Sequence, residues 1–382
     1  MLKLFSIGHS YAVALNRRLA HEMAIAGKNK WQVAVVAPKY FHGGSDLHPV
    51  CFEPLHEEPC DLISLDTYGS RFVHCFIYES KLRSILKQNW NLIHCWEEPY
   101  VLAGAQVSFF KDTNMPIVYH TAQNIRKTYP PPLCWTEQYT MHRASGWIGC
   151  GHSVIGTLKD SPSYSNKPKR MIPLGVDIET FQTNLSIRKE TLRKLEWEDS
   201  QIPVIGYTGR FVAEKGVSFL MCVLDKIKSP WRALFVGNGI LESQMRAWAK
   251  SYGDQVRIVT DARHFDMPAY LNAMDLLCAP SQTTKKWREQ FGRMIIEAFA
   301  CGVPVIGSDS GEIPYVIGDA GIIVSEKDEE EWVRQISQLL ENPEKRKSLA
   351  LAGRERAETK YAWSVIARQY LDFFEEILQN KE

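Results

Sequence analysis

Short apolar runs rich in β-branched residues alternate with amphipathic stretches of helical length along the chain. Between residues 12 and 25, for example, apolar positions recur near the 3.6-residue period of an α-helix. In the first half the apolar runs predict strands at Leu2–Ile7, Gln32–Ala37, Leu92–Trp96, Ile117–His120 and Trp147–Cys150. Strands that alternate with helices indicate βαβ units and a mostly parallel, doubly wound sheet.

The alternation stops at about residues 176–200, which are polar and charged, and then begins again. The second series predicts strands at Val204–Tyr207, Ala233–Val236, Val256–Val259, Leu276–Ala279 and Val303–Gly307. We therefore expect two Rossmann-like domains of α/β class, covering residues 1–180 and 181–362. A final helix from Trp363 carries an apolar stripe that must pack on one of them, and its periodicity does not say which.

Composition narrows the class of protein. The chain has 45 basic and 44 acidic residues and is 45% hydrophobic, which argues against a disordered chain and against an electrostatic nucleic-acid binder. Nine scattered cysteines without a CxxC pair suggest no disulfide framework or zinc ribbon and fit a reducing, cytoplasmic compartment. No apolar run reaches the roughly 18 residues of a membrane-spanning helix, so we expect a soluble protein.

Two Rossmann-like domains often belong to an oxidoreductase, but the dinucleotide fingerprint is missing. The chain has Gly8-His9-Ser10 after its first strand and Gly206-Tyr207-Thr208-Gly209 at the corresponding place in the second series, and neither is GxGxxG. A Walker loop and a GxSxG elbow are missing as well.

The densest chemistry lies at residues 280–321. A loop carrying Glu289 leads into Phe291-Gly292, which opens a helix containing Glu297. Free amides at a helix start bind anions, and a glycine there allows a diphosphate to approach closely. The two carboxylates on either side suit a phosphorylated sugar, although isolated glutamates are more often solvated surface charges.

A second segment, GRFVAEKG at 209–216, follows the first strand of the same domain. Ligands of open α/β sheets bind at the carboxyl ends of strands, so Arg210 and Lys215 should face the same crevice as Glu289. A guanidinium and an ammonium together form a suitable clamp for a diphosphate.

These motifs occur in a characteristic order: GRFVAEKG, VGNG, DLLCAPS, EQFGRMIIE and GVPVIGSDSGEIPYVIGDAG. In this order the chain resembles the retaining glycosyltransferases of family four, which have the GT-B fold. Glu289 and Glu297 match their E-x7-E signature, residues 172–181 match their interdomain segment, and Tyr119-His120-Thr121 matches more loosely. The resemblance implies two Rossmann-like domains facing a cleft, with the C-terminal helix (363–382) crossing back to the acceptor-side domain 1–180, and 181–362 as the donor domain.

The resemblance also implies an activity, the transfer of a sugar, with retention, from a UDP-, GDP- or ADP-sugar to a hydroxyl of an acceptor glycan, lipid or small molecule. The enzyme would be a hexosyltransferase, without a metal or other cofactor. Arg210, Lys215 and the Phe291-Gly292 backbone would hold the donor diphosphate, and Glu297 the ribose. Glu289 and His120, the expected catalytic residues, would contact the donor sugar, and Gly8 would lie near the reaction centre.

Some features leave other interpretations open. Many relatives have a Gly-Gly pair where this chain has only Gly8, followed by His9. A GT-B nucleotide-sugar epimerase and a non-catalytic nucleotide-sugar-binding subunit are therefore alternative functions. Residues 125–147 mix basic and aromatic residues, among them Trp135 and Trp147, either as a patch for peripheral contact with the inner membrane face or as a buried or loop segment.

Overall fold

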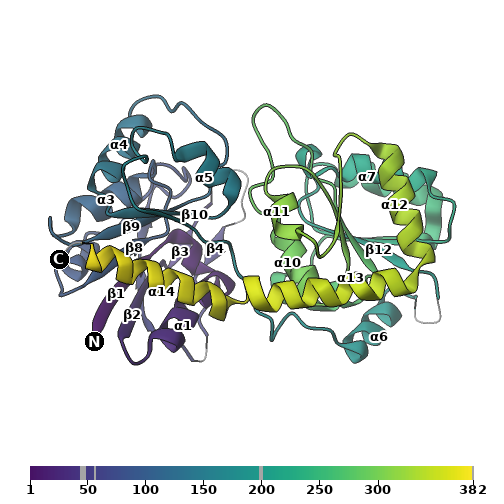
Figure 1. Cartoon of the computed structure of the whole chain (residues 1–382), viewed down its shortest axis with the longest axis horizontal. Helices are drawn as coiled ribbons and strands as arrows, with labels where there is room; N and C mark the ends of the chain where they lie inside the picture. Colours follow the sequence, from purple (N-terminus) through teal and green to yellow (C-terminus); the bar gives the residue numbers. More distant parts are fainter. Residues whose placement is uncertain (44–48, 56, 198–200, 381–382) are drawn as a thin grey trace. The chain divides into compact units, whose positions relative to one another are not determined.

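The computed structural model describes residues 1–43, 49–55, 57–197 and 201–380, and the chain forms two compact units (Figure 1). The first unit contains Met1–Pro173 and the C-terminal segment from Trp363, and the second contains Leu174–Ala362. The sequence analysis expected the division at residue 180. The structure places it earlier because the Val176 amide bonds to the Tyr361 carbonyl at 2.8 Å, which joins this segment to the second unit.

The first unit is built on a seven-stranded sheet in the order β11-β10-β9-β8-β1-β2-β5, and every pairing in it is parallel. The order reverses between β1 and β8, so this is the topological switch point of the sheet. Two short antiparallel pairs, β3·β4 and β6·β7, lie outside the sheet. The strands are β1 (Leu2–Ile7), β2 (Trp31–Pro38), β3 (Tyr40–Phe41), β4 (Val50–Cys51), β5 (Asp61–Leu65), β6 (Thr67–Tyr68), β7 (Ile77–Tyr78), β8 (Leu92–Cys95), β9 (Ile117–Thr121), β10 (Gly146–Gly149) and β11 (Lys169–Met171).

Successive side chains of these strands enter two different hydrophobic cores, as the two-residue period of a strand requires. Leu4 and Val35 belong to the core under α1 and α14, while Phe5 and Val36 belong to the core under α2, α3, α4 and α5. Helices therefore cover both faces, which confirms the doubly wound prediction. The helices are η1 (His9–Ala12), α1 (Ala14–Gly27), α2 (Lys81–Leu86), α3 (Leu102–Phe110), α4 (Leu133–Arg143), α5 (His152–Leu158) and α14 (Trp363–Gln379).

The second unit repeats this plan with a six-stranded parallel sheet in the order β14-β13-β12-β15-β16-β17, and its switch point lies between β12 and β15. Its strands are β12 (Val204–Thr208), β13 (Arg232–Val236), β14 (Val256–Val259), β15 (Leu276–Ala279), β16 (Val305–Ser308) and β17 (Ile322–Val324). Its helices are α6 (Leu185–Lys194), η2 (Ala213–Lys215), α7 (Val217–Lys226), α8 (Glu242–Ala249), η3 (Lys250–Gln255), η4 (His264–Asp266), α9 (Met267–Asn272), α10 (Arg293–Ala300), α11 (Ile313–Ile317), α12 (Glu329–Glu341), α13 (Pro343–Arg356) and η5 (Ala357–Tyr361).

The C-terminal helix α14 belongs to the first unit, as expected, and lies along α1 (Figure 1). Its apolar stripe is buried to at least 96%; these residues are Ile366, Tyr370, Phe373, Phe374 and Ile377. Fully burying one such apolar side chain stabilises a fold by about 1.5–3 kcal/mol. The stripe therefore accounts for the return of the chain to its first unit.

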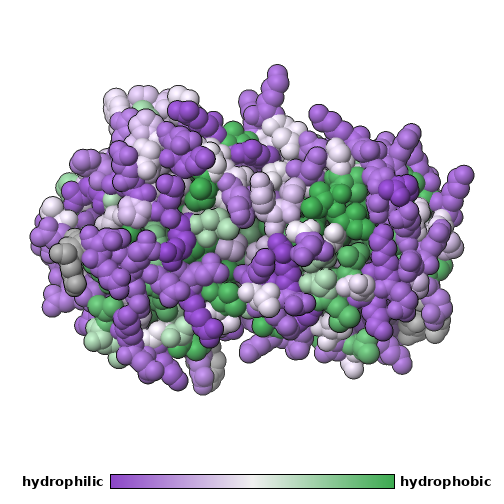
Figure 2. All heavy atoms as spheres, viewed as in Figure 1, coloured by the Kyte–Doolittle hydropathy of each residue, from purple (hydrophilic) through white to green (hydrophobic). Residues whose placement is uncertain are grey.

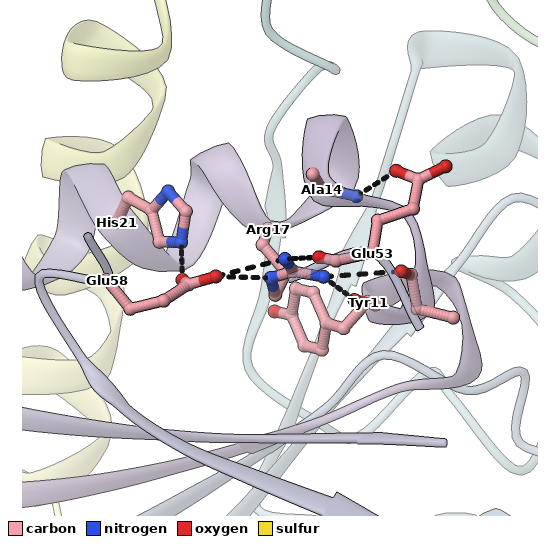
Figure 3. Close-up of polar contacts among 7 residues, drawn as sticks. Tyr11, Ala14, Arg17, His21, Glu53 and Glu58 are labelled. Carbon is pink, nitrogen blue, oxygen red and sulfur yellow. Dashed lines mark hydrogen bonds and ion pairs between the residues drawn. The ribbon is translucent and has the colours of Figure 1, made fainter. Parts of the chain in front are cut away.

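A buried arginine of α1 ties Glu53 and Glu58 to that helix (Figure 3). Arg17 is fully buried and donates hydrogen bonds to the carbonyls of Tyr11, Ala12 and Glu53. It also pairs with Glu58 at 3.0 Å, and His21 contacts the other oxygen of the same carboxylate. These acceptors compensate the desolvation of the Arg17 charge, so its burial leaves no unmatched ion in the core.

Hydrophilic side chains cover most of the visible face of each unit, with hydrophobic groups in smaller patches (Figure 2). Over the described residues, none of the helices combines the length and apolarity of a membrane span. Of the two tryptophans in the segment 125–147, Trp135 is 63% exposed and Trp147 is fully buried. The buried alternative therefore applies to Trp147, whose indole packs in the core and donates to the Tyr164 carbonyl at 3.2 Å.

Candidate functional site

The loops that follow β12 and β15 meet at the switch point of the second unit. Gly216, with a φ of +71°, lies so close to the loop after β15 that a Cβ would be 1.9 Å from the Pro280 carbonyl oxygen. Only glycine allows this approach and this backbone conformation. The contact holds η2, which ends at Lys215, beside the residues that lead to Glu289.

Lys215 and Glu289 form an ion pair there, with Nζ 2.6 Å from Oε2. The two side chains are only 15% and 6% exposed. The Ser281 hydroxyl donates to the same carboxylate oxygen at 2.8 Å, and the Lys215 ammonium lies 5.1 Å from the centre of the Trp287 ring. The structure thus brings together the lysine and the glutamate that the sequence analysis assigned to one crevice.

The backbone around Glu289 is held by the loop after β16. Gly311, with a φ of +57°, packs so tightly that a Cβ would lie 2.0 Å from the Glu289 carbonyl oxygen, and the Glu312 amide donates to that oxygen at 3.1 Å. The Glu289 side chain therefore emerges from a backbone that two loops fix in place. This rigidity suits a group that must meet a ligand in one orientation.

Arg210 does not join this pair. Its guanidinium is half exposed, and its nearest carboxylate partner, Glu214, is 3.9 Å away. Its main chain is anchored, because the Tyr207 hydroxyl donates to the Arg210 carbonyl at 2.8 Å. The side chain of Arg210 thus projects from a fixed backbone with most of its hydrogen-bonding capacity directed to solvent.

Helix α10 begins at Arg293, immediately after Gly292, whose φ of +85° is the left-handed conformation that favours glycine. No side-chain hydrogen bond caps this helix start, and the positive end of the helix dipole there favours an anion. The Phe291 side chain is 4% exposed and belongs to the core. The Phe291 side chain is therefore part of the core, and a ligand at this helix start would meet the backbone of Phe291.

Glu297 lies farther along α10, is 6% exposed and is hydrogen-bonded to His264, with Nε2 2.9 Å from Oε1. The sequence analysis did not identify His264. This residue opens η4 after β14, and no motif links it to the E-x7-E pair, so only the folded chain shows that it supports Glu297.

In the first unit, Gly8 follows β1 and lies beside Trp96, where a Cβ would lie 3.0 Å from both the Trp96 Cβ and its carbonyl oxygen. The predicted catalytic residue His120 lies near the end of β9 and is 5% exposed. Its Nδ1 is 3.0 Å from the Tyr370 hydroxyl of α14. Burial lowers the pKa of His120 to about 3. His120 is therefore neutral at physiological pH and suits hydrogen bonding to a ligand better than proton transfer.

A histidine–glutamate pair that the sequence analysis missed lies at the switch point of the same unit. His9 Nδ1 is 2.5 Å from Oε2 of Glu97, a residue that follows β8 and is 1% exposed. The neighbouring Glu98 accepts hydrogen bonds from the Ala122 amide and the Thr121 hydroxyl, both at 2.7 Å. Burial raises the pKa of Glu98 to about 7 despite these hydrogen bonds.

In the part of the chain that the structure describes, one group has the spacing of metal ligands. His21, Glu58 and Cys60 place one potential ligand atom each within 4.8 Å of one another. The Glu58 carboxylate is already paired with the buried guanidinium of Arg17 (Figure 3). We therefore assign this group to the Arg17 contacts described above. Burial raises the pKa of the Cys60 thiol to about 12, so this thiol stays protonated.

Comparison with known proteins places this geometry in context. Residues 188–356, less than half of the chain, match the family described as glycosyl transferases group 1. The chain is 28% identical over 255 residues to the GDP-mannose-dependent monoacylated alpha-(1-6)-phosphatidylinositol monomannoside mannosyltransferase of Corynebacterium glutamicum, covering 65% of this chain and 63% of that protein. It is 26% identical over 329 residues to the capsular polysaccharide biosynthesis glycosyltransferase CapM of Staphylococcus aureus, covering 79% and 83%.

Among solved structures, HepE of Anabaena in complex with UDP and glucose superposes with a TM-score of 0.73 at 18% identity, covering 98% of this chain and 100% of that one. This likeness confirms the predicted GT-B fold. The segment similar to the glycosyl transferases group 1 family lies within the second unit, and the residues discussed above at the switch point of its sheet lie within that segment.

Proposed function

We propose that this chain is a retaining hexosyltransferase that moves a sugar from a nucleotide diphosphate sugar to a hydroxyl of an acceptor. The observation that carries the proposal is the Lys215–Glu289 pair at the switch point of the second unit. A cation for a diphosphate and a carboxylate for sugar hydroxyls are adjacent there, as a sugar diphosphate requires, because its phosphate is bonded directly to the sugar.

Different residues would bind different parts of the donor. Lys215, Arg210 and the first amides of α10 would hold the diphosphate, and Glu289 would accept hydrogen bonds from the sugar hydroxyls. Glu297, with His264 behind it at 2.9 Å, would hold the ribose. His120, as a neutral hydrogen-bonding group of the first unit, would contact the sugar.

Catalysis in this scheme depends on stabilising the leaving group. The bond between the anomeric carbon and the diphosphate oxygen breaks, and the electron pair leaves with the diphosphate. Fixed cations and amides directed at the charge that develops are effective because they need no reorganisation during the reaction. These groups would do the work that a divalent ion does elsewhere, so we propose that no metal is required.

The donor and acceptor classes follow from chemistry and from the relatives. One relative is named as GDP-mannose-dependent, and HepE binds UDP and glucose. We propose a UDP-, GDP- or ADP-sugar as donor and a glycan or lipid-linked hydroxyl as acceptor. The names of the relatives, a phosphatidylinositol mannoside mannosyltransferase and a capsular polysaccharide enzyme, support acceptors of that kind.

Thermal unfolding of the full chain with a panel of UDP-, GDP- and ADP-sugars tests donor binding. A ligand at about ten times its Kd stabilises the unit that binds it by about 1.4 kcal/mol. For a unit of this size, that corresponds to an increase in Tm of about 3–6 °C. Lys215→Met should abolish the increase. Lys226→Met, at a 57% exposed lysine paired with Glu329, should leave it unchanged.

Product analysis then separates the possible activities. NMR of the product with the preferred donor should show the anomeric configuration retained, and Glu289→Gln should lower kcat by about 10²-fold or more. An inverted product would contradict the retaining assignment. An epimerised donor, formed without acceptor, would show an epimerase instead. Donor binding without turnover on any lipid or glycan acceptor would indicate a binding subunit.

A further inference from the structure

The ammonium of Lys215 contacts two groups of different kinds. It pairs with the Glu289 carboxylate at 2.6 Å, and its Nζ lies over the Trp287 ring, 5.1 Å from the ring centre. The face of an aromatic ring attracts a cation, most strongly over tryptophan and when both groups are shielded from water. The Lys215 side chain is 15% exposed and Trp287 is half-buried, so this contact is partly shielded. Trp287 therefore helps to decide where the ammonium lies.

The turn that carries Trp287 has a fixed backbone. The Thr284 amide donates to the Trp287 carbonyl at 2.7 Å, and the Trp287 amide donates to the Thr284 hydroxyl at 3.0 Å. The preceding residue, Thr283, donates its amide to the Glu326 carboxylate at 2.6 Å, and its hydroxyl lies 2.9 Å from the Ser310 hydroxyl. The turn is thus tied to the loops after β16 and β17, and it holds the Trp287 ring beside the lysine.

The ring and the carboxylate hold Lys215 in different ways. An ammonium has three N–H donors, and within the described residues the structure shows one hydrogen bond from this one, to Glu289. The ring attracts the cation without an acceptor atom, so it leaves the remaining donors to a ligand. The ring also carries no net charge. A second carboxylate at this place would repel a diphosphate, whereas a tryptophan does not.

We propose that Trp287 is a positioning residue for Lys215, whose ring holds the ammonium for the donor diphosphate when the Glu289 carboxylate turns to the donor sugar. The proposal rests on the donor binding proposed above. Trp287 acts through Lys215 and does not touch the reacting atoms.

This role makes the ring contact more important in the complex than in the unliganded unit. As Glu289 accepts hydrogen bonds from the sugar hydroxyls, its hold on the ammonium weakens, while the contact with Trp287 needs no change. The ring then keeps Lys215 in place on the protein side. A contact that contributes more to the complex than to the free protein favours binding, so Trp287 should strengthen the affinity for the donor.

Isothermal titration of the full chain, with the nucleotide sugar of the panel that raises the Tm most, measures the donor Kd of each variant. Trp287→Leu removes the aromatic face and should raise the Kd by about 3–30-fold, the range of a partly shielded contact between a cation and a ring. Trp287→Phe keeps a weaker face and should give an intermediate Kd. Trp248→Leu is the matched control, because Trp248 of α8 is also half-buried but packs against Tyr252, with ring centres 4.9 Å apart. It should leave the donor Kd unchanged.

Fluorinated tryptophans introduced at position 287 alone separate electrostatics from packing. Each added fluorine weakens the attraction between the ring face and a cation while the ring nearly keeps its size. The donor Kd should therefore rise stepwise from one to three fluorines. These variants retain the indole, so they decide the question if Trp287→Leu fails to fold.

Wild-type donor binding separates this proposal from the function on which it rests. A wild-type chain that binds none of the UDP-, GDP- and ADP-sugars would overturn the proposed function and the role of Trp287 together. Wild-type binding with a Kd that stays constant across the fluorinated series would overturn the role of Trp287 alone. A weaker affinity of Trp287→Leu would then be an effect of packing.

Discussion

Replacing Lys215 by methionine should destabilise the second unit as well as abolish donor binding. The substitution removes the Lys215 ammonium from the Glu289 carboxylate, which is 6% exposed, while the Ser281 hydroxyl still donates to the same oxygen at 2.8 Å. Methionine nearly matches the lysine stem in length, so the change removes charge with little loss of volume.

The magnitude follows from the distance and the burial. Two unit charges 2.6 Å apart attract by about 6 kcal/mol at an effective dielectric constant of about 20. Desolvation of the two groups offsets much of this attraction, so the intact pair contributes little net stability. Removing the lysine is more costly, about 3 kcal/mol, because the Glu289 carboxylate stays buried without the opposite charge of Lys215.

A double-mutant cycle isolates this coupling. We expect Lys215→Met and Glu289→Gln each to destabilise the unit, and the double variant to be no less stable than Lys215→Met alone, which gives a coupling energy of about 2 kcal/mol. Hydrogen exchange of the β12 and β15 amides (residues 204–208 and 276–279), followed by mass spectrometry of the full chain, reports the free energy of unfolding of this unit.

Additive effects would refute the reasoning. If the two single changes sum to the double change within about 0.5 kcal/mol, the side chains are not coupled. The pair would then have no part in holding the site in its unliganded form. The free-energy change caused by Arg188→Met gives a comparison value for the loss of another ion pair in the same unit, because Arg188 lies 2.9 Å from Asp275.

Three further predictions concern the backbone, the proton balance and the C-terminal helix. Gly292 has a φ of +85°, and the Cβ of Gly292→Ala would lie 2.9 Å from Ile295 Cδ1, so this variant should lose about 1–3 kcal/mol of stability and bind the donor more weakly. Gly156 in α5 has open space around it, so Gly156→Ala should stabilise the chain slightly against thermal unfolding. Burial raises the pKa of Glu98 from 4.5 to about 7, so the folded state binds this proton more tightly than the unfolded state does. The free energy of unfolding, measured by urea titration, should therefore fall as the pH rises from about 4.5 to 7. Glu98→Gln should remove that slope. Tyr370→Phe removes the hydroxyl that lies 3.0 Å from His120 Nδ1, and it should lower kcat and reduce stability by about 1 kcal/mol. Unchanged kinetics would exclude a role of Tyr370 in positioning His120.

The sequence by itself determined the fold class and most of the strands. The strands expected at Leu2–Ile7, Val256–Val259 and Leu276–Ala279 are observed with the same bounds. Buried parallel strands are continuous apolar runs, which a sequence displays directly. The edge strands β5, β11 and β17 were missed, and β11 and β17 have only three residues each, which show too little pattern to detect.

Local signals also located part of the candidate site. Gly292 and Glu297 lie where a helix-start pattern predicts them, because a helix start depends on neighbours along the chain. The E-x7-E spacing located Glu289 and Glu297 in the same way, since both are positioned by one loop and one helix.

Only the tertiary structure decided which groups meet across elements. Lys215 and Glu289 are 74 residues apart, His9 and Glu97 are 88 apart, and His264 and Glu297 are 33 apart. The first two contacts depend on the strand order, which places β1 beside β8 and β12 beside β15 at the two switch points. The third depends on the packing of the segment after β14 against α10. The position of α14 was likewise decided by packing, because an apolar stripe specifies that a helix is buried but not the surface that buries it.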